Sequence, residues 1–138
     1  MTAVSYAPAR RPLGSRTLAD AIRAEGRLPL DQVCRIGLRL LDAIEAAHAA
    51  GVVHGNVQPG TVQLFDDDRV VLLFGAEGGV AEPTRDGDLV ALGATLFAAS
   101  AGRPGFLRSV IDDLFDPGTR CGIDQIRAAL TIGQGQFF

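Results

Sequence analysis

Apolar side chains recur at steps of three and four residues along several stretches of the chain. The longest stretch begins after Pro29 and ends at Gly51. Its apolar stripe consists of Val33, Ile36, Leu40, Leu41, Ile44, Ala47 and His48. Residues 106–115 and 123–130 repeat the pattern over shorter lengths. This is the period of an α-helix with one buried face, so the sequence predicts a mainly α-helical protein.

Two further helices are predicted, one from its ends and one from its composition. Thr17 and Asp20 have the spacing of a capping box at the start of a short helix, and Gly26 is placed to end that helix. The other helix begins at Asp88, continues through Ser100 and is apolar on every side. A helix of that kind is expected to be buried on all sides.

Residues 62–65 and 70–73 predict two short strands, joined by Asp66, Asp67 and Asp68. Three successive carboxylates could bind a cation. Asp side chains in a turn, however, bond to nearby backbone groups, and no further oxygen ligand lies close in the sequence. We therefore interpret the three residues as the turn of a β-hairpin.

The periodic stretches form one globular domain between two terminal segments. The chain has 138 residues, of which 47% are hydrophobic and 21% charged, an ordinary balance for a folded domain. Residues 15–130 contain all the predicted elements. Residues 1–14 show no periodicity and are expected to be a flexible arm. Residues 131–138, rich in glycine and polar side chains, are expected to be a C-terminal tail.

Composition also limits the partners of the protein. A net charge of −3 argues against nucleic acid. The longest apolar run, residues 89–101, is too short to span a bilayer, so membrane insertion is not expected. The first 13 residues lack the apolar core of a signal peptide, which favours a cytoplasmic location. Cys34 and Cys121 match no metal-binding spacing, and neither a metal nor another cofactor is expected.

The segment from residue 54 to residue 64 carries the most informative polar residues, His54, Asn56, Gln58 and Thr61. It resembles the catalytic loop of protein kinases, which reads His-Arg-Asp-x-Lys-x-x-Asn. In that family the Asp accepts the proton of the substrate hydroxyl, and the Asn holds a magnesium ion. The resemblance places Asn56 at the Asp, Gln58 at the Lys and Thr61 at the Asn. An amide has no ionisable oxygen, so Asn56 cannot serve as that base.

The resemblance extends beyond this loop, to bacterial serine/threonine protein kinases of the actinobacterial type. Leu73, Phe74 and Gly75 stand where the family has Asp-Phe-Gly, with Leu73 in place of the metal-binding Asp. Asp88 resembles the aspartate at the start of the central helix of the large lobe, and the resemblance implies that it accepts hydrogen bonds from backbone amides of the loop near His54 and Gly55. Arg120 resembles a structural arginine near the end of that lobe. The resemblance implies structural roles for His54, Phe74, Gly75, Asp88 and Arg120.

The fold implied by the resemblance is a protein-kinase-like C-terminal lobe, a helical bundle with a short β-hairpin, without the small lobe. The chain contains no lysine, whereas kinases hold the ATP phosphates with one. Only twelve residues separate Gly75 from Asp88, too few for a kinase activation segment. Because base, metal ligands and lysine are all missing, the chain is not expected to be an enzyme.

Segments that the family has and this chain lacks would cover apolar surface. We therefore expect the wall around Val62, Leu64 and Leu72, and the helix that follows Asp88, to face solvent in a monomer. Large uncovered apolar patches usually mark interfaces. The interface candidates are Leu89, Leu92, Leu96, Phe97 and Phe106. This favours a pseudokinase remnant that acts as a protein–protein interaction, scaffold or regulatory module, binding another protein or a second copy of itself.

Three alternatives remain open. The chain could be a pseudoenzyme that holds a nucleotide or another small molecule against Leu64, Leu72 and Asn56. It could be half of a split kinase-like assembly. It could also be an enzyme of another kind, with His54 as a base and Asp88 beside it. In kinases this histidine is structural and bonds to the backbone near the Phe of Asp-Phe-Gly, which favours the structural role.

Overall fold

The computed structural model describes residues 15–65, 69–73, 83–116 and 123–134. Within these ranges the chain forms five α-helices and one three-stranded sheet. The elements are β1 (Ser15–Thr17), α1 (Leu18–Glu25), α2 (Leu30–Ala49), β2 (Val62–Phe65), β3 (Val70–Leu72), α3 (Arg85–Ala99), α4 (Arg108–Phe115) and α5 (Ile123–Gln134). Single turns of 3-10 helix at Pro59–Thr61 and Gly105–Leu107 precede β2 and α4.

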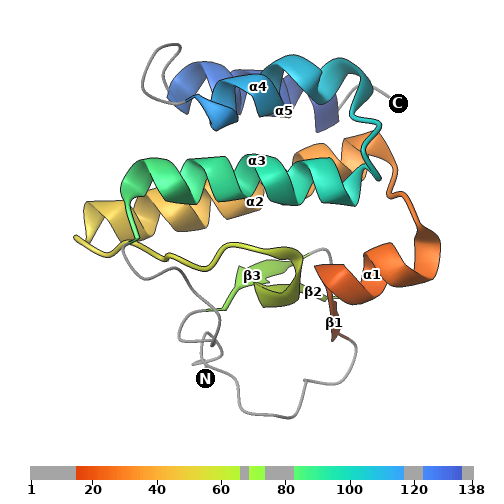
Figure 1. The fold of residues 1–138 in the computed structure, drawn as a ribbon, viewed down its shortest axis with the longest axis horizontal. Helices are drawn as coiled ribbons and strands as arrows, with labels where there is room; N and C mark the ends of the chain where they lie inside the picture. The colour runs from red at the N-terminus through yellow and green to blue at the C-terminus, as the bar shows by residue number, and fades with distance from the viewer. Residues whose placement is uncertain (1–14, 66–68, 74–82, 117–122, 135–138) are drawn as a thin grey trace.

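The elements form three layers (Figure 1). The long helices α2 and α3 lie side by side in the middle layer. Helices α4 and α5 cover one side of this pair, α4 against α3 and α5 against α2. Helix α1 and the sheet lie on the opposite side. The prediction of a mainly helical fold with a short β-hairpin is confirmed.

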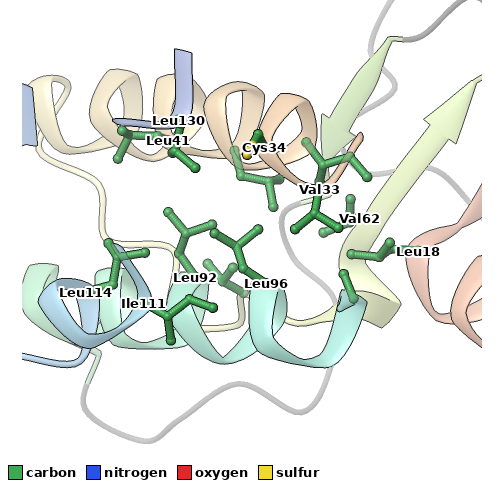
Figure 2. Packing of buried hydrophobic residues seen from close by; sticks show 14 of the residues in the cluster. Leu18, Val33, Cys34, Leu41, Val62, Leu92, Leu96, Ile111, Leu114 and Leu130 are labelled. Carbon is green, nitrogen blue, oxygen red and sulfur yellow. The ribbon is translucent and has the colours of Figure 1, made fainter. Parts of the chain in front are cut away.

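The core lies where these layers meet, and its side chains come from every layer (Figure 2). Residues with no more than 1% of their surface exposed include Leu18, Val33, Cys34, Leu41, Val62, Leu92, Leu96, Ile111, Leu114 and Leu130. The apolar stripe predicted for the long helix is the face of α2 that enters this core. Burial of each such side chain contributes about 1.5–3 kcal/mol to stability.

The ends of α1 are those predicted from the sequence. The Thr17 Oγ1 atom accepts a hydrogen bond from the backbone N–H of Asp20 at 3.0 Å. The Asp20 carboxylate accepts one from the backbone N–H of Thr17 at 3.2 Å, which completes the capping box. Gly26 ends the helix with a φ of 77°, a conformation that favours glycine.

The sheet is antiparallel in the order β1, β2, β3. Strands β2 and β3 match the predicted hairpin, although β3 ends one residue earlier, at Leu72. Strand β1 was not predicted, because three residues are too few to show an alternating pattern. It pairs Arg16 with Leu64. The buried Gln63 side chain donates a hydrogen bond to the Ser15 hydroxyl at 2.7 Å.

Two helix boundaries differ from those predicted. Helix α3 begins at Arg85 rather than at Asp88, because Thr84 caps it and accepts a hydrogen bond from the backbone N–H of Gly87 at 2.9 Å. Helix α5 continues to Gln134, so the predicted end of this helix at residue 130 was wrong. Glycine suggested a tail, but Gly133 is buried and lets α5 approach α2 closely.

The predicted exposure of two apolar surfaces was also wrong. Val62, Leu64 and Leu72 are at most 9% exposed, because α1 and α2 pack against the sheet. The interface candidates Leu89, Leu92 and Leu96 are buried as well, where α3 contacts α2 and α4. The candidates Phe97 and Phe106 are 41% and 43% exposed. Since Val90 of α3 is also exposed, this helix is not buried on all sides.

Several sequence-based predictions lie outside the described residues. They concern the arm at residues 1–14, the turn at Asp66–Asp68, the structural roles of Phe74 and Gly75, and the arginine at position 120.

Candidate functional site

The candidate site is the loop between α2 and β2. Helix α2 ends at Ala49, and Gly51, with a φ of 83°, turns the chain out of the helix. Gly55 also has a positive φ, 77°, in the left-handed region where side chains are disfavoured. The loop then enters the 3-10 turn Pro59–Thr61, which leads directly into β2.

Asp88, in the first turns of α3, holds this loop. Its Oδ2 atom accepts a hydrogen bond from the backbone N–H of His54 at 2.9 Å, and its Oδ1 atom accepts one from Gly55 at 2.8 Å. These are the bonds expected from the sequence, and the expectation is confirmed. The His48 Nε2 atom of α2 lies 2.8 Å from Oδ2, a contact that was not predicted. Asp88 is 2% exposed, so its charge is compensated by these three donors rather than by water.

The His54 ring is fixed in one tautomer by two backbone groups. Its Nδ1 atom accepts a hydrogen bond from the Asn56 backbone N–H at 2.9 Å. The proton of a neutral ring must then be on Nε2, which donates to the Leu73 carbonyl oxygen at 2.7 Å. With the Nδ1 lone pair engaged, His54 has no nitrogen available as a base. Asp88 bonds to the backbone of His54 and not to its ring, so the alternative of a His54–Asp88 acid–base pair gains no support.

The residues that the resemblance places at the kinase catalytic positions bond to one another. The Gln58 side-chain amide donates a hydrogen bond to the Asn56 Oδ1 atom at 2.7 Å. The Thr61 hydroxyl lies 2.9 Å from the Asn56 carbonyl oxygen and 3.0 Å from that of Gln58, and it accepts from the Gln58 backbone N–H at 3.2 Å. The Leu73 backbone N–H donates to the Thr61 carbonyl oxygen at 2.8 Å. The four positions therefore meet in one place, but none of their side chains can ionise.

Comparisons with known proteins find bacterial kinases among the relatives of this chain, although no protein-family model matches it. Serine/threonine-protein kinase PknK of Mycobacterium tuberculosis is 32% identical over 117 residues, an alignment that covers 67% of this chain and 10% of PknK. PksC of Streptomyces coelicolor is 39% identical over 54 residues, covering 39% of this chain and 10% of PksC. PknE of Mycobacterium tuberculosis is 34% identical over 79 residues, covering 57% and 13%. The chain is a homologue of the bacterial serine/threonine kinases.

This kinase homologue spans about a tenth of the length of those relatives. Among solved structures it resembles a mutant of the Neurospora crassa PAN3 pseudokinase, with a TM-score of 0.56 and 17% identity, over 91% of this chain and 34% of that one. At this identity the likeness shows the fold alone, which is kinase-like. None of the described helices is both long and apolar enough to cross a membrane.

The described residues around the kinase-like loop provide few groups that could bind a metal ion. Among the described residues, no three His, Cys, Asp or Glu side chains come together as they do around a metal. The side chain of Leu73, which the resemblance places at the metal-binding Asp, contains only carbon and hydrogen. The carboxylate of Asp88, which contacts this loop, is buried and already accepts hydrogen bonds from His48, His54 and Gly55.

Two cavities of the described chain lie away from this loop. One of about 470 Å³ is lined by residues 27–31, at the start of α2. A smaller one of about 30 Å³ lies between α2 and the hairpin, beside Arg35 and Phe65. Asn56, Thr61 and Leu73 line neither of them. The loop itself is a hydrogen-bonded connection between α2, β2 and α3.

The polar network around Asn56 was not predicted from the sequence, although part of it has a sequence pattern. Gln58 and Thr61 are three residues apart on either side of Pro59, which is the spacing of a capping box, and the structure has such a box there. The contact between His48 and Asp88 has no comparable pattern, because 40 residues separate the two.

Proposed function

We propose that this chain is a non-catalytic, kinase-like module that acts through protein–protein interaction. The observation that carries the proposal is the bond between Gln58 and Asn56, the residues at the positions of the kinase Lys and Asp. Phosphoryl transfer needs a group that accepts the substrate proton and charges that hold the phosphates and metal. At this site an amide faces an amide, and neither can change its charge.

The way the loop is held supports the same proposal. The Asp88 carboxylate and the His54 ring fix the backbone of the loop by hydrogen bonds, and neither residue is at one of the substituted positions. The loop can therefore keep a kinase-like path without any catalytic side chain. A domain built in this way can present surfaces to a partner while performing no chemistry.

Burial at the hairpin favours interaction over nucleotide binding. A nucleotide held against Leu64 and Leu72 would need those side chains to be open, yet they are 9% and 4% exposed. Exposed apolar side chains occur instead on the helices and turns, at Val52, Val90, Phe97, Phe106, Phe115 and Ile132. Single exposed apolar residues are ordinary, but several on neighbouring elements are typical of interfaces.

Incubation with labelled ATP and Mg²⁺ or Mn²⁺ tests the catalytic half of the proposal. We expect no incorporation of phosphate into the chain or into general protein substrates, while an active bacterial serine/threonine kinase assayed in parallel incorporates it. Autophosphorylation by the wild type would overturn the proposal. A rise of several degrees in Tm with ATP, without phosphate transfer, would favour the nucleotide-binding pseudoenzyme instead.

A further inference from the structure

One face of α3 is apolar and open to solvent. Val90 and Phe97 are 37% and 41% exposed, and Ala94 between them is exposed as well. At 3.6 residues per turn these three positions lie within about 60° of one another around the helix axis. We call them the α3 stripe. The other face of the helix carries Leu92 and Leu96, which are fully buried.

The aromatic residue of the stripe lies beside a glycine of the following turn. A Cβ atom added at Gly102 would lie 3.5 Å from two ring carbons of Phe97, so the ring rests against the turn that follows α3. A supported but exposed aromatic ring is the kind of side chain that anchors protein interfaces, because little conformational freedom is lost when it is covered.

Charges of opposite sign flank the stripe. Asp86, one turn before Val90, is exposed on the same face at the N-terminal end of α3. Arg103 is exposed just beyond the C-terminal end. Neither side chain forms an ion pair with any residue that the structure describes. The stripe is thus negative at one end and positive at the other.

This arrangement is complementary to itself when reversed. An antiparallel copy of α3, related by a twofold axis between residues 93 and 94, would place Val90 against the partner's Phe97. The same operation places Asp86 opposite the partner's residue 101, within reach of the partner's Arg103. Ala94, next to the axis, has a side chain small enough for the two helices to approach closely.

We propose that the α3 stripe binds a second copy of the chain, forming a twofold antiparallel helix pair flanked by two Asp86–Arg103 ion pairs. The proposal rests on the proposed function and names the partner of that interaction module. A twofold interface uses the same patch on both partners, as this geometry requires. One helix face covers less than the roughly 800 Å² per partner of a standard interface, so we expect a weak dimer that dissociates on dilution.

Analytical ultracentrifugation of the 138-residue chain over a wide range of concentrations tests the proposal. We expect the wild type to pass reversibly from monomer to dimer. Ala94→Glu puts two like charges beside the axis, so it should raise the dissociation constant at least tenfold. The matched control, Ala128→Glu at an exposed position of α5, should leave the dissociation constant within twofold. Circular dichroism and Tm verify that both variants are folded.

Charge reversal tests the orientation of the pair. Asp86→Arg and Arg103→Asp should each weaken the dimer severalfold, and the double variant should recover most of the wild-type affinity. In a Cys121→Ser background, oxidation of Ala94→Cys should yield a disulfide-linked dimer. A wild type that stays monomeric at all concentrations would overturn the proposal. So would a dimer that neither Ala94→Glu nor charge reversal affects.

Two further outcomes separate this proposal from the proposed function. A monomeric chain that binds a different purified protein through α3, shown by crosslinking from position 94, would overturn self-pairing and leave the interaction module intact. Phosphate transfer by a chain that dimerises as described would remove the proposed function and leave the α3 pair standing.

Discussion

The Asp88 carboxylate accepts a hydrogen bond from the backbone N–H of Gly55, 33 residues earlier in the chain, at 2.8 Å. With the bond from His54 and the contact to His48, it joins the start of α3 to the end of α2 and to the loop that follows. Nothing in this arrangement depends on the residues that a kinase uses for catalysis. The loop can therefore keep its form although Asn56 and Thr61 are neutral.

Removal of the charge at position 88 should destabilise the fold. We expect Asp88→Asn to lower the free energy of unfolding by about 2–4 kcal/mol, because it weakens several charge-assisted hydrogen bonds in a buried site. Urea denaturation measures the change. Asp86→Asn, an exposed position in the same turn of α3, is the control and should change stability by less than about 1 kcal/mol. Equal effects of the two substitutions would contradict the role assigned to Asp88.

Restoring the acidic residues of the kinase pattern should not restore activity. We expect Asn56→Asp combined with Leu73→Asp to transfer no labelled phosphate from ATP, with either Mg²⁺ or Mn²⁺. The two carboxylates could bind a metal, but the chain contains no lysine to hold the ATP phosphates. Phosphate incorporation by the double variant above the level of the wild type would show that the site lacks only these two groups.

A local pattern was sufficient to predict the ends of α1, and the resemblance to kinases predicted the hydrogen bonds of Asp88 to the loop. The two residues of the capping box, Thr17 and Asp20, are three positions apart in the sequence, and the structure contains the box. The bonds of Asp88 followed from the resemblance to kinases, in which the matching residue makes them. In both cases the two bonded partners can be identified from their positions in the sequence, by a fixed spacing for the capping box and by the match to the kinase pattern for Asp88.

Burial on the faces of α3 and of the sheet could not be predicted in the same way. The absence of kinase segments suggested that Leu92 and Leu64 would be uncovered, but helices α2, α4 and α1 pack closely enough to bury them. Such packing depends on the relative placement of whole elements, which the periodicity of one helix does not contain. Only the side of α3 that carries Val90 and Phe97 is open.

A methyl group at position 133 should not fit between α5 and α2. A Cβ atom there would lie 2.4 Å from the Cys34 Sγ atom and 2.9 Å from the ring of Phe106. We expect Gly133→Ala to lower the free energy of unfolding by about 1–3 kcal/mol, in spite of the better helix propensity of alanine. Thr131→Ala, at an exposed position of the same helix, serves as control. In a double-mutant cycle, Cys34→Ala should reduce the cost of Gly133→Ala, and additivity would show that the two do not touch.

The Cys34 thiol should resist both alkylation and ionisation in the native protein. Burial, and to a lesser extent the negative charge of Asp31, raise its pKa from 9.0 to about 11. In a Cys121→Ser background we expect no reaction with iodoacetamide at pH 8 until urea unfolds the chain. Rapid modification of the folded protein would show that the α2–α5 contact around Cys34 opens easily.

The same raised pKa makes stability depend on pH in the alkaline range. Below about pH 9 the thiol is protonated in both the folded and the unfolded chain, so its contribution is fully present. Between pH 9 and 11 the unfolded thiol loses its proton while the native one keeps it, and stability falls by up to about 1.4 kcal/mol per pH unit. Urea denaturation at pH 8 and pH 10.5 should therefore show a larger loss for the Cys121→Ser protein than for the same protein with Cys34→Ala. Equal losses in the two would mean that the native thiol ionises as readily as the unfolded one.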